Sequence, residues 1–173
     1  MEIKRRIVKS ETLAVHEENL MGMPVILKDA AVVETDAAGD ETVTIPDMDA
    51  LVAAIAVNRC LEPGKLTGGE IRFMRKALGM TQSAFAETLE IDPATVSRWE
   101  NDGQVLGGFA EKCLRHLVCD TFHAEFPHFD YDPKRISYMK IMVPAQGERT
   151  EPMVFVRVRG ISDQMNIWGR QAA

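Results

Sequence analysis

The residues best suited to specific chemistry lie on a short helix expected over 92–102, in the segment DPATVSRWEND. Four of them gather on its outer side at about 100° per residue: Ala94, Ser97, Arg98 and Asn101. This face offers a small residue, a hydroxyl, a guanidinium and an amide, and no acid. A guanidinium can donate two hydrogen bonds to O6 and N7 of guanine. The chemistry expected of this face is therefore base recognition in a DNA major groove.

A second short helix, expected from Thr81 to Leu89, precedes this one and completes a helix-turn-helix pattern. The free N–H groups at its start can bind a phosphate, and Gln82 has the length to reach the DNA backbone. Val96 and Trp99 fall on the inner side of the later helix and are predicted to anchor it in the core. The candidate DNA-contacting residues are Arg75, Gln82, Ser83, Ala94, Thr95, Ser97, Arg98 and Asn101.

Capping signals set the limits of these helices. Thr67 and Glu70 form the pattern of a capping box, which predicts a helix beginning at that point. Asp92 is a favourable N-cap, and Pro93 occupies the first helical position, where a missing N–H costs little. Two glycines and one further helix complete the pattern: Gly79 and Gly103 as helix ends, and a helix over 108–122.

The segment MTQSAFAETLEIDPATVSRWENDG resembles the lambda-repressor-like, XRE-type helix-turn-helix regulators, in which TQ, a helical alanine and an SRWE-like ending recur. Over residues 22–119 the chain is similar to MqsA-type antitoxins that carry a YgiT-type N-terminal zinc module. The resemblance implies a dimer that binds palindromic DNA, often in its own promoter. Arg98 would then read a base, whereas Ala94 stands where asparagine is common and inherits no hydrogen bond.

The zinc module of that family differs here in its ligands. Its members hold one zinc ion with two CxxC pairs, but TDAAGDE places Thr35 and Ala38 at two of these positions, and no cysteine precedes Cys60. We therefore interpret this module as a zinc-free relative held by apolar packing, and expect no cofactor. The resemblance also implies toxin binding through this module, an alternative function that the missing cysteines weaken.

One other group of side chains could bind metal or act as a nucleophile. It consists of Cys113, His116, Cys119 and His123. Four ligands on one straight helix cannot surround a tetrahedral ion without help from elsewhere. A Cys–His pair would also need an oxyanion motif or an orienting third group, and none is visible. Ordinary packing is the simpler interpretation, and enzyme activity is not expected.

The length, charge and cysteine content of the chain are those expected of a regulatory protein in the cytoplasm. The chain has 173 residues, a formal net charge of −6 and three cysteines without CxxC spacing. An acidic total does not exclude DNA binding, because a local surface can differ in sign from the whole. No apolar run is long enough to cross a membrane, and the N-terminus lacks the apolar core of a secretory signal.

The chain is expected to be α+β in three parts. Residues 1–64 form a β-rich module, with strands in PVILKDAAVV and ETVTIP and a helix from Asp47. Residues 65–122 form the central all-α, lambda-repressor-like DNA-binding bundle. In residues 123–173, period-two alternation in ISYMKIMV and MVFVRVRG predicts a β-hairpin, which could serve dimerisation, partner binding or ligand sensing. The last dozen residues are expected to be poorly ordered.

The leading interpretation is a homodimeric repressor that binds double-stranded DNA and occludes a promoter. The alternative is an antitoxin of a toxin–antitoxin pair, which would also neutralise a small ribonuclease. A short basic reading frame beside the gene would favour the alternative.

Overall fold

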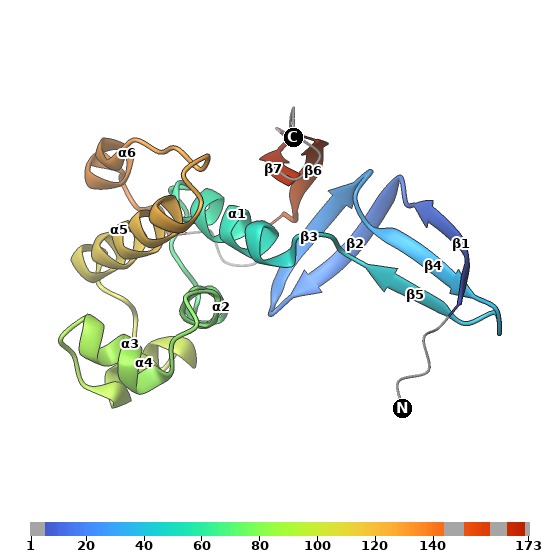
Figure 1. Cartoon of the computed structure of the whole chain (residues 1–173). Coiled ribbons are helices and arrows are strands. Elements are labelled where there is room, and N and C mark those ends of the chain that lie inside the picture. The colour runs from blue at the N-terminus through green and yellow to red at the C-terminus, as the bar shows by residue number, and fades with distance from the viewer. Residues whose placement is uncertain (1–5, 144–150, 160–165, 172–173) are drawn as a thin grey trace. The chain divides into compact units, whose positions relative to one another are not determined.

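The computed structural model describes residues 6–143, 151–159 and 166–171. The fold is α+β, as the sequence predicts, with strands at both ends of the chain and helices between them (Figure 1). Two compact units are present. The first comprises residues 1–20, 24–51 and 152–173, and the second comprises 21–23 and 52–151.

The first unit contains a three-stranded antiparallel sheet. Its strands are β1 (Ile7–Thr12), β4 (Val32–Asp36) and β5 (Glu41–Thr44), with β4 in the middle (Figure 1). A turn after Asp36 joins β4 to β5. The Asp36 carboxylate accepts hydrogen bonds from the backbone N–H groups of Ala38 and Asp40, at 2.9 and 3.0 Å. A carboxylate thus stabilises this turn locally. The apolar packing expected from the sequence is not found in this sheet, because β1 and β5 are exposed throughout and the buried residue of β4 is Asp36.

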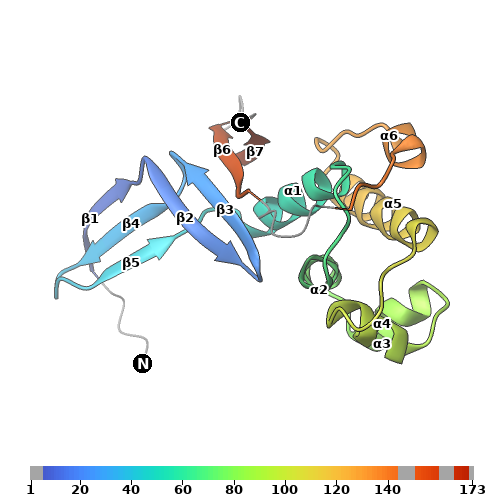
Figure 2. The same ribbon diagram turned by 180° about the vertical axis from the view of Figure 1, so that it is seen from behind.

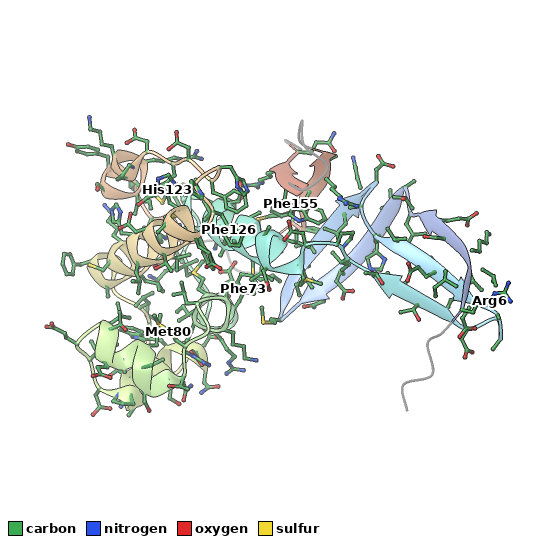
Figure 3. The ribbon with its side chains drawn as sticks, in the orientation of Figure 1. Arg6, Phe73, Met80, His123, Phe126 and Phe155 are labelled. Atoms are coloured by element: carbon green, nitrogen blue, oxygen red, sulfur yellow. The ribbon has the colours of Figure 1, made fainter. Side chains whose placement is uncertain are left out.

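A four-stranded sheet completes the first unit. Its order is β2 (Val15–Leu20), β3 (Met23–Lys28), β6 (Met153–Arg159) and β7 (Asn166–Arg170). β3 and β6 run parallel although well over a hundred residues separate them, and β6 and β7 run antiparallel. Val25 and Leu27 on β3 are buried, as is Phe155 on β6 (Figure 3). Strands from both ends of the chain therefore contribute buried apolar side chains to this sheet.

The predicted C-terminal hairpin is wrong in its first strand, whereas its second strand is confirmed as β6. Residues of ISYMKIMV were expected to form its first strand, and they instead begin as helix α6 (Pro133–Tyr138). Asp132 caps this helix by accepting the N–H of Lys134, and Pro133 occupies its first position. This local signal outweighs the period-two alternation. β7, from the last dozen residues, pairs with β6 in place of that segment, so the expectation of poor order was wrong for Asn166–Arg170.

The second unit is helical. Besides α6, its helices are α1 (Met48–Cys60), which begins in the first unit, α2 (Gly68–Ala77), α3 (Gln82–Thr88), α4 (Pro93–Glu100) and α5 (Gly108–Glu125) (Figure 2). The capping box predicted for Thr67 and Glu70 is confirmed. Asp47 was expected to cap α1, but it has a left-handed φ of 52° rather than the extended conformation of an N-cap. Phe73 on α2 is fully buried in this unit (Figure 3).

Two buried ion pairs link the helices to the segment between α1 and α2. Arg59 binds Glu70 through Nε and Nη2, at 2.5 and 3.0 Å. Arg115 on α5 binds Glu111 at 2.8 Å, and also donates to the carbonyl groups of Cys60 and Gly64. The Arg115 side chain is fully buried, so these acceptors replace the water that its charge loses. The connection between α1 and α2 is therefore fixed by charge-assisted hydrogen bonds.

The start of α2 lies directly against the end of α4 at Gly68. A Cβ atom at this position would lie 2.6 Å from the carbonyl oxygen of Trp99 and 2.8 Å from that of Glu100. The Gly68 N–H also donates to the Asp102 carboxylate at 2.9 Å. Only glycine allows this approach without displacing the backbone of α4.

We expect Gly68→Ala to lower the free energy of unfolding by about 1–3 kcal/mol, because the added methyl group overpacks a backbone contact. Gly69→Ala is the matched control, since its Cβ would find only the Thr67 hydroxyl, at 3.9 Å. Alanine at that helical position should be neutral or slightly stabilising. Urea denaturation of both variants checks this expectation, and equal stabilities would contradict it.

Candidate nucleic-acid interface

Helix α4 is positioned by its first residues and by its inner face. The Asp92 carboxylate accepts the N–H of Ala94 at 2.6 Å, and Pro93 occupies the first turn, as predicted. Val96 is fully buried and Trp99 is 6% exposed, which confirms that both residues anchor the helix in the core. The opposite face is consequently turned away from the helical core.

The outer face of α4 carries the residues expected from the sequence. Ala94, Arg98 and Asn101 are exposed, and Thr95 and Ser97 are half-buried. The Arg98 guanidinium donates to the Thr95 hydroxyl at 2.8 Å and to the Gln104 side-chain oxygen at 3.1 Å. The face is therefore rich in hydrogen-bonding groups, and one of them is a cation. Their contact with DNA stays a prediction.

Helix α3 contributes two more candidate residues from its first turn. Thr81 caps this helix by accepting the N–H of Ala84 at 3.1 Å. Ser83 is exposed, whereas Gln82 is half-buried and donates to the Glu100 carboxylate on α4 at 2.9 Å. Gln82 thus contacts the later helix, as expected from its length. One of its donors is already engaged within the protein.

Glu100 joins α2, α3 and α4, a role that the sequence did not reveal. Its side chain is fully buried, and it accepts hydrogen bonds from Arg75 at 2.5 and 3.0 Å. Arg72 lies 3.5 Å from the same carboxylate. The sequence offered one signal of this role: Glu100 directly follows Trp99, which is expected to be buried, and the expected outer face of the helix carries no acid. Nothing in the sequence indicated which arginine it binds.

Arg75 therefore differs from its predicted role. It was included among the candidate DNA contacts, but its side chain is only 11% exposed. Nε and Nη2 bind Glu100, and Nη1 donates to the carbonyl of Met80 at 2.8 Å. All three nitrogens are engaged within the protein, so this arginine holds α2 against α4. Arg72 is the more accessible cation, and it donates to the Asn101 side-chain oxygen at 2.7 Å.

The Glu100 carboxyl group has a lowered pKa. Burial alone would raise its pKa, but hydrogen bonds from Arg75 and Gln82, together with the charges of Arg75 and Arg72, outweigh that effect. Glu111 behaves alike: burial opposes ionisation, and Lys65, Arg115 and the Leu66 N–H lower its pKa. Both groups are therefore carboxylates under neutral conditions.

The cysteine and histidine residues on α5 do not converge. Cys113 is exposed and Cys119 is buried, while His116 contacts the Ser137 hydroxyl and His123 contacts the carbonyl of Phe129. Burial, followed by a hydrogen bond with Cys119, raises the pKa of the Cys60 thiol well above its usual value. Within the part of the chain that the structure describes, no three His, Cys, Asp or Glu side chains are grouped to hold a metal ion.

Comparison with known proteins agrees with a helix-turn-helix in this region. Residues 71–117, from α2 into α5, match a family model described as helix-turn-helix. No curated protein and no solved structure matches the chain. The match supports a DNA-binding helix-turn-helix of the XRE type in this segment. Among the described residues, no helix is long and apolar enough to span a membrane.

The lowered pKa of Glu100 and Glu111 predicts a loss of stability in acid. A carboxyl group whose pKa is lower in the folded state stabilises the protein above its unfolded pKa, and this contribution disappears as the pH falls through the folded value. We expect the free energy of unfolding to decrease below about pH 4.5. Urea denaturation between pH 7 and pH 3 measures this decrease.

Glu100→Gln should be less stable than the wild type at pH 7 by more than about 2 kcal/mol, because it leaves the half-buried Arg75 without its counter-charge. Its stability should also depend less on pH in acid. Glu87→Gln, on the exposed side of α3, is the matched control. If the Glu100 and Glu87 variants have the same pH profile, the buried pair does not carry the acid sensitivity.

Proposed function

We propose that this protein is a sequence-specific transcription regulator that binds operator DNA as a homodimer and represses by occluding a promoter. The observation that carries the proposal is the outer face of α4 within a segment that matches a helix-turn-helix family. That face presents Arg98 and Asn101 to solvent, while the only acid of the helix, Glu100, is buried and ion-paired. Burial of Glu100 removes one negative charge from this side of the helix, although its N-cap Asp92 and the following Asp102 stay exposed.

We expect a dimer because one short helix contacts too few base pairs to specify an operator. A single α4 covers only a few base pairs, and regulators of this kind gain specificity by reading two half-sites about one helical turn, or roughly 34 Å, apart. A two-fold symmetric protein then prefers an inverted repeat. Repression needs no chemistry beyond this binding, because a bound dimer excludes the polymerase from the promoter. An operator near the gene itself would make the protein an autorepressor.

Arg98→Ala should weaken specific binding by about 1–3 kcal/mol in each half-site, because the guanidinium can no longer donate to a base. Binding to unrelated DNA should change much less, since phosphate contacts carry that affinity. Arg135→Ala is the matched control, because it removes an equal charge from an exposed site on α6. Fluorescence anisotropy with specific and scrambled duplexes measures both affinities. An equal decrease in affinity in the two variants would show that Arg98 contributes only charge.

A second candidate function, toxin neutralisation, is supported by the outer strand β1. Every residue of β1 is exposed, including Ile7 and Val8, and β1 pairs with a strand on one side only. An exposed edge strand can add a strand from another chain, and Ile7 and Val8 offer apolar contacts at the start of β1. This function would place a small ribonuclease on the first unit.

The test begins with the gene's neighbour. If the neighbour encodes a short basic protein, co-expression should yield a complex, and Val8→Lys should weaken that complex while leaving DNA binding intact. Thr42→Lys on the other outer strand, β5, is the matched control. A neighbour that neither binds nor harms the cell would remove this candidate.

A further inference from the structure

Gln104, which was not among the candidate site residues, contacts the arginine expected to read DNA. It is exposed and lies just after the glycine that follows α4. Its side-chain oxygen accepts the Nε–H of Arg98 at 3.1 Å. The backbone also fixes the pair, because the N–H groups of Gly103 and Gln104 both donate to the Arg98 carbonyl, at 2.8 and 3.3 Å. Gln104 is thus held next to the arginine by two hydrogen bonds of its own, and Gly103 adds a third from the backbone.

The hydrogen bonds of Arg98 leave one edge of its guanidinium available. A guanidinium has five N–H donors. Nε donates to the Gln104 side-chain oxygen and Nη2 donates to the Thr95 hydroxyl, so both nitrogens of the side edge have an acceptor. Nη1, which forms the end edge together with Nη2, has no acceptor among the described residues. That end edge is the fork that can donate to O6 and N7 of guanine.

We propose that Gln104 is a positioning residue for base recognition, which, together with Thr95, directs the end edge of Arg98 toward one guanine in each half-site. This inference rests on the proposed function. An unrestrained arginine would lose more side-chain freedom on binding, and could swing to a phosphate instead. Two acceptors on its side edge reduce that loss before DNA arrives.

The acceptor on Gln104 is neutral, and this matters for its role. A carboxylate on the side edge would hold the arginine equally well but would repel the nearby DNA phosphates. An amide orients the guanidinium and leaves its full positive charge for the DNA. Gln104 should therefore affect which base is preferred more than how tightly any DNA is bound.

The experiment starts from duplexes that the wild-type protein selects from a random library. Each guanine of the selected site is replaced in turn by 7-deazaguanine, which lacks the N7 acceptor, and affinities are compared with those for the unmodified duplex. At one guanine per half-site, this replacement should lower the affinity of the wild-type protein about tenfold or more. Arg98→Ala should show no such penalty at that guanine.

Gln104→Leu removes the acceptor and leaves an apolar side chain that is one atom shorter. We expect the 7-deazaguanine penalty to fall about three- to tenfold in this variant, with little change in binding to scrambled DNA. Gln104→Glu should restore the penalty while lowering the affinity for all duplexes. Val105→Ala, at the exposed neighbouring residue, is the control and should behave as the wild type. Denaturation curves of the Gln104 variants should match the wild type, since the residue is exposed.

Three results would separate the possible failures. If Gln104→Leu keeps the full penalty while Arg98→Ala loses it, Arg98 reads the base without help and the positioning role is wrong. If Gln104→Leu weakens binding to specific and scrambled DNA equally, Gln104 binds a phosphate and the positioning role is again wrong. If Arg98→Ala retains the wild-type penalty at every guanine, the base-reading role of Arg98 itself fails, and the inference falls with it.

Discussion

The helix-turn-helix depends on one buried carboxylate, that of Glu100. Its bonds to Arg75 on α2 and Gln82 on α3 fix α4 relative to both neighbouring helices. A buried acid is unfavourable by itself, and becomes acceptable only when charged and polar partners replace its water. The same arrangement removes the only acid of α4 from the surface. This interaction thus adds to the N-cap and the buried inner face in positioning α4.

The helical elements of this region could be predicted because their signals are local. The capping box at Thr67 and the Asp92–Pro93 pair define helix starts within a few residues. The inward direction of Val96 and Trp99 follows from helical periodicity alone. A short helix with a strong N-cap, an apolar inner side and a polar outer side leaves little freedom in how it packs, so its exposed face could be deduced before the structure.

Features that depend on distant contacts could not be predicted. β6 pairs in parallel with β3, although most of the chain separates the two strands in sequence. The alternation of apolar and polar residues within β6 gives no information about which strand it pairs with. The alternation that includes Ile136 suggested a strand, although Asp132 and Pro133 start a helix there. Arg75 looked like a surface cation, because a sequence does not show that a buried carboxylate lies beside it. For the same reason Gln104, in the turn after α4, gave no sign of its contact with Arg98.

The central claim is that the outer face of α4 reads a DNA sequence. The most direct measurement is repeated selection of duplexes by the full-length protein from a random library, followed by sequencing of the bound fraction. We expect enrichment of an inverted repeat whose half-sites lie about one helical turn apart, with a guanine at the same position in each. Recovery of DNA without any sequence preference, with binding that weakens steeply as salt is raised, would indicate phosphate contacts alone and would contradict the claim.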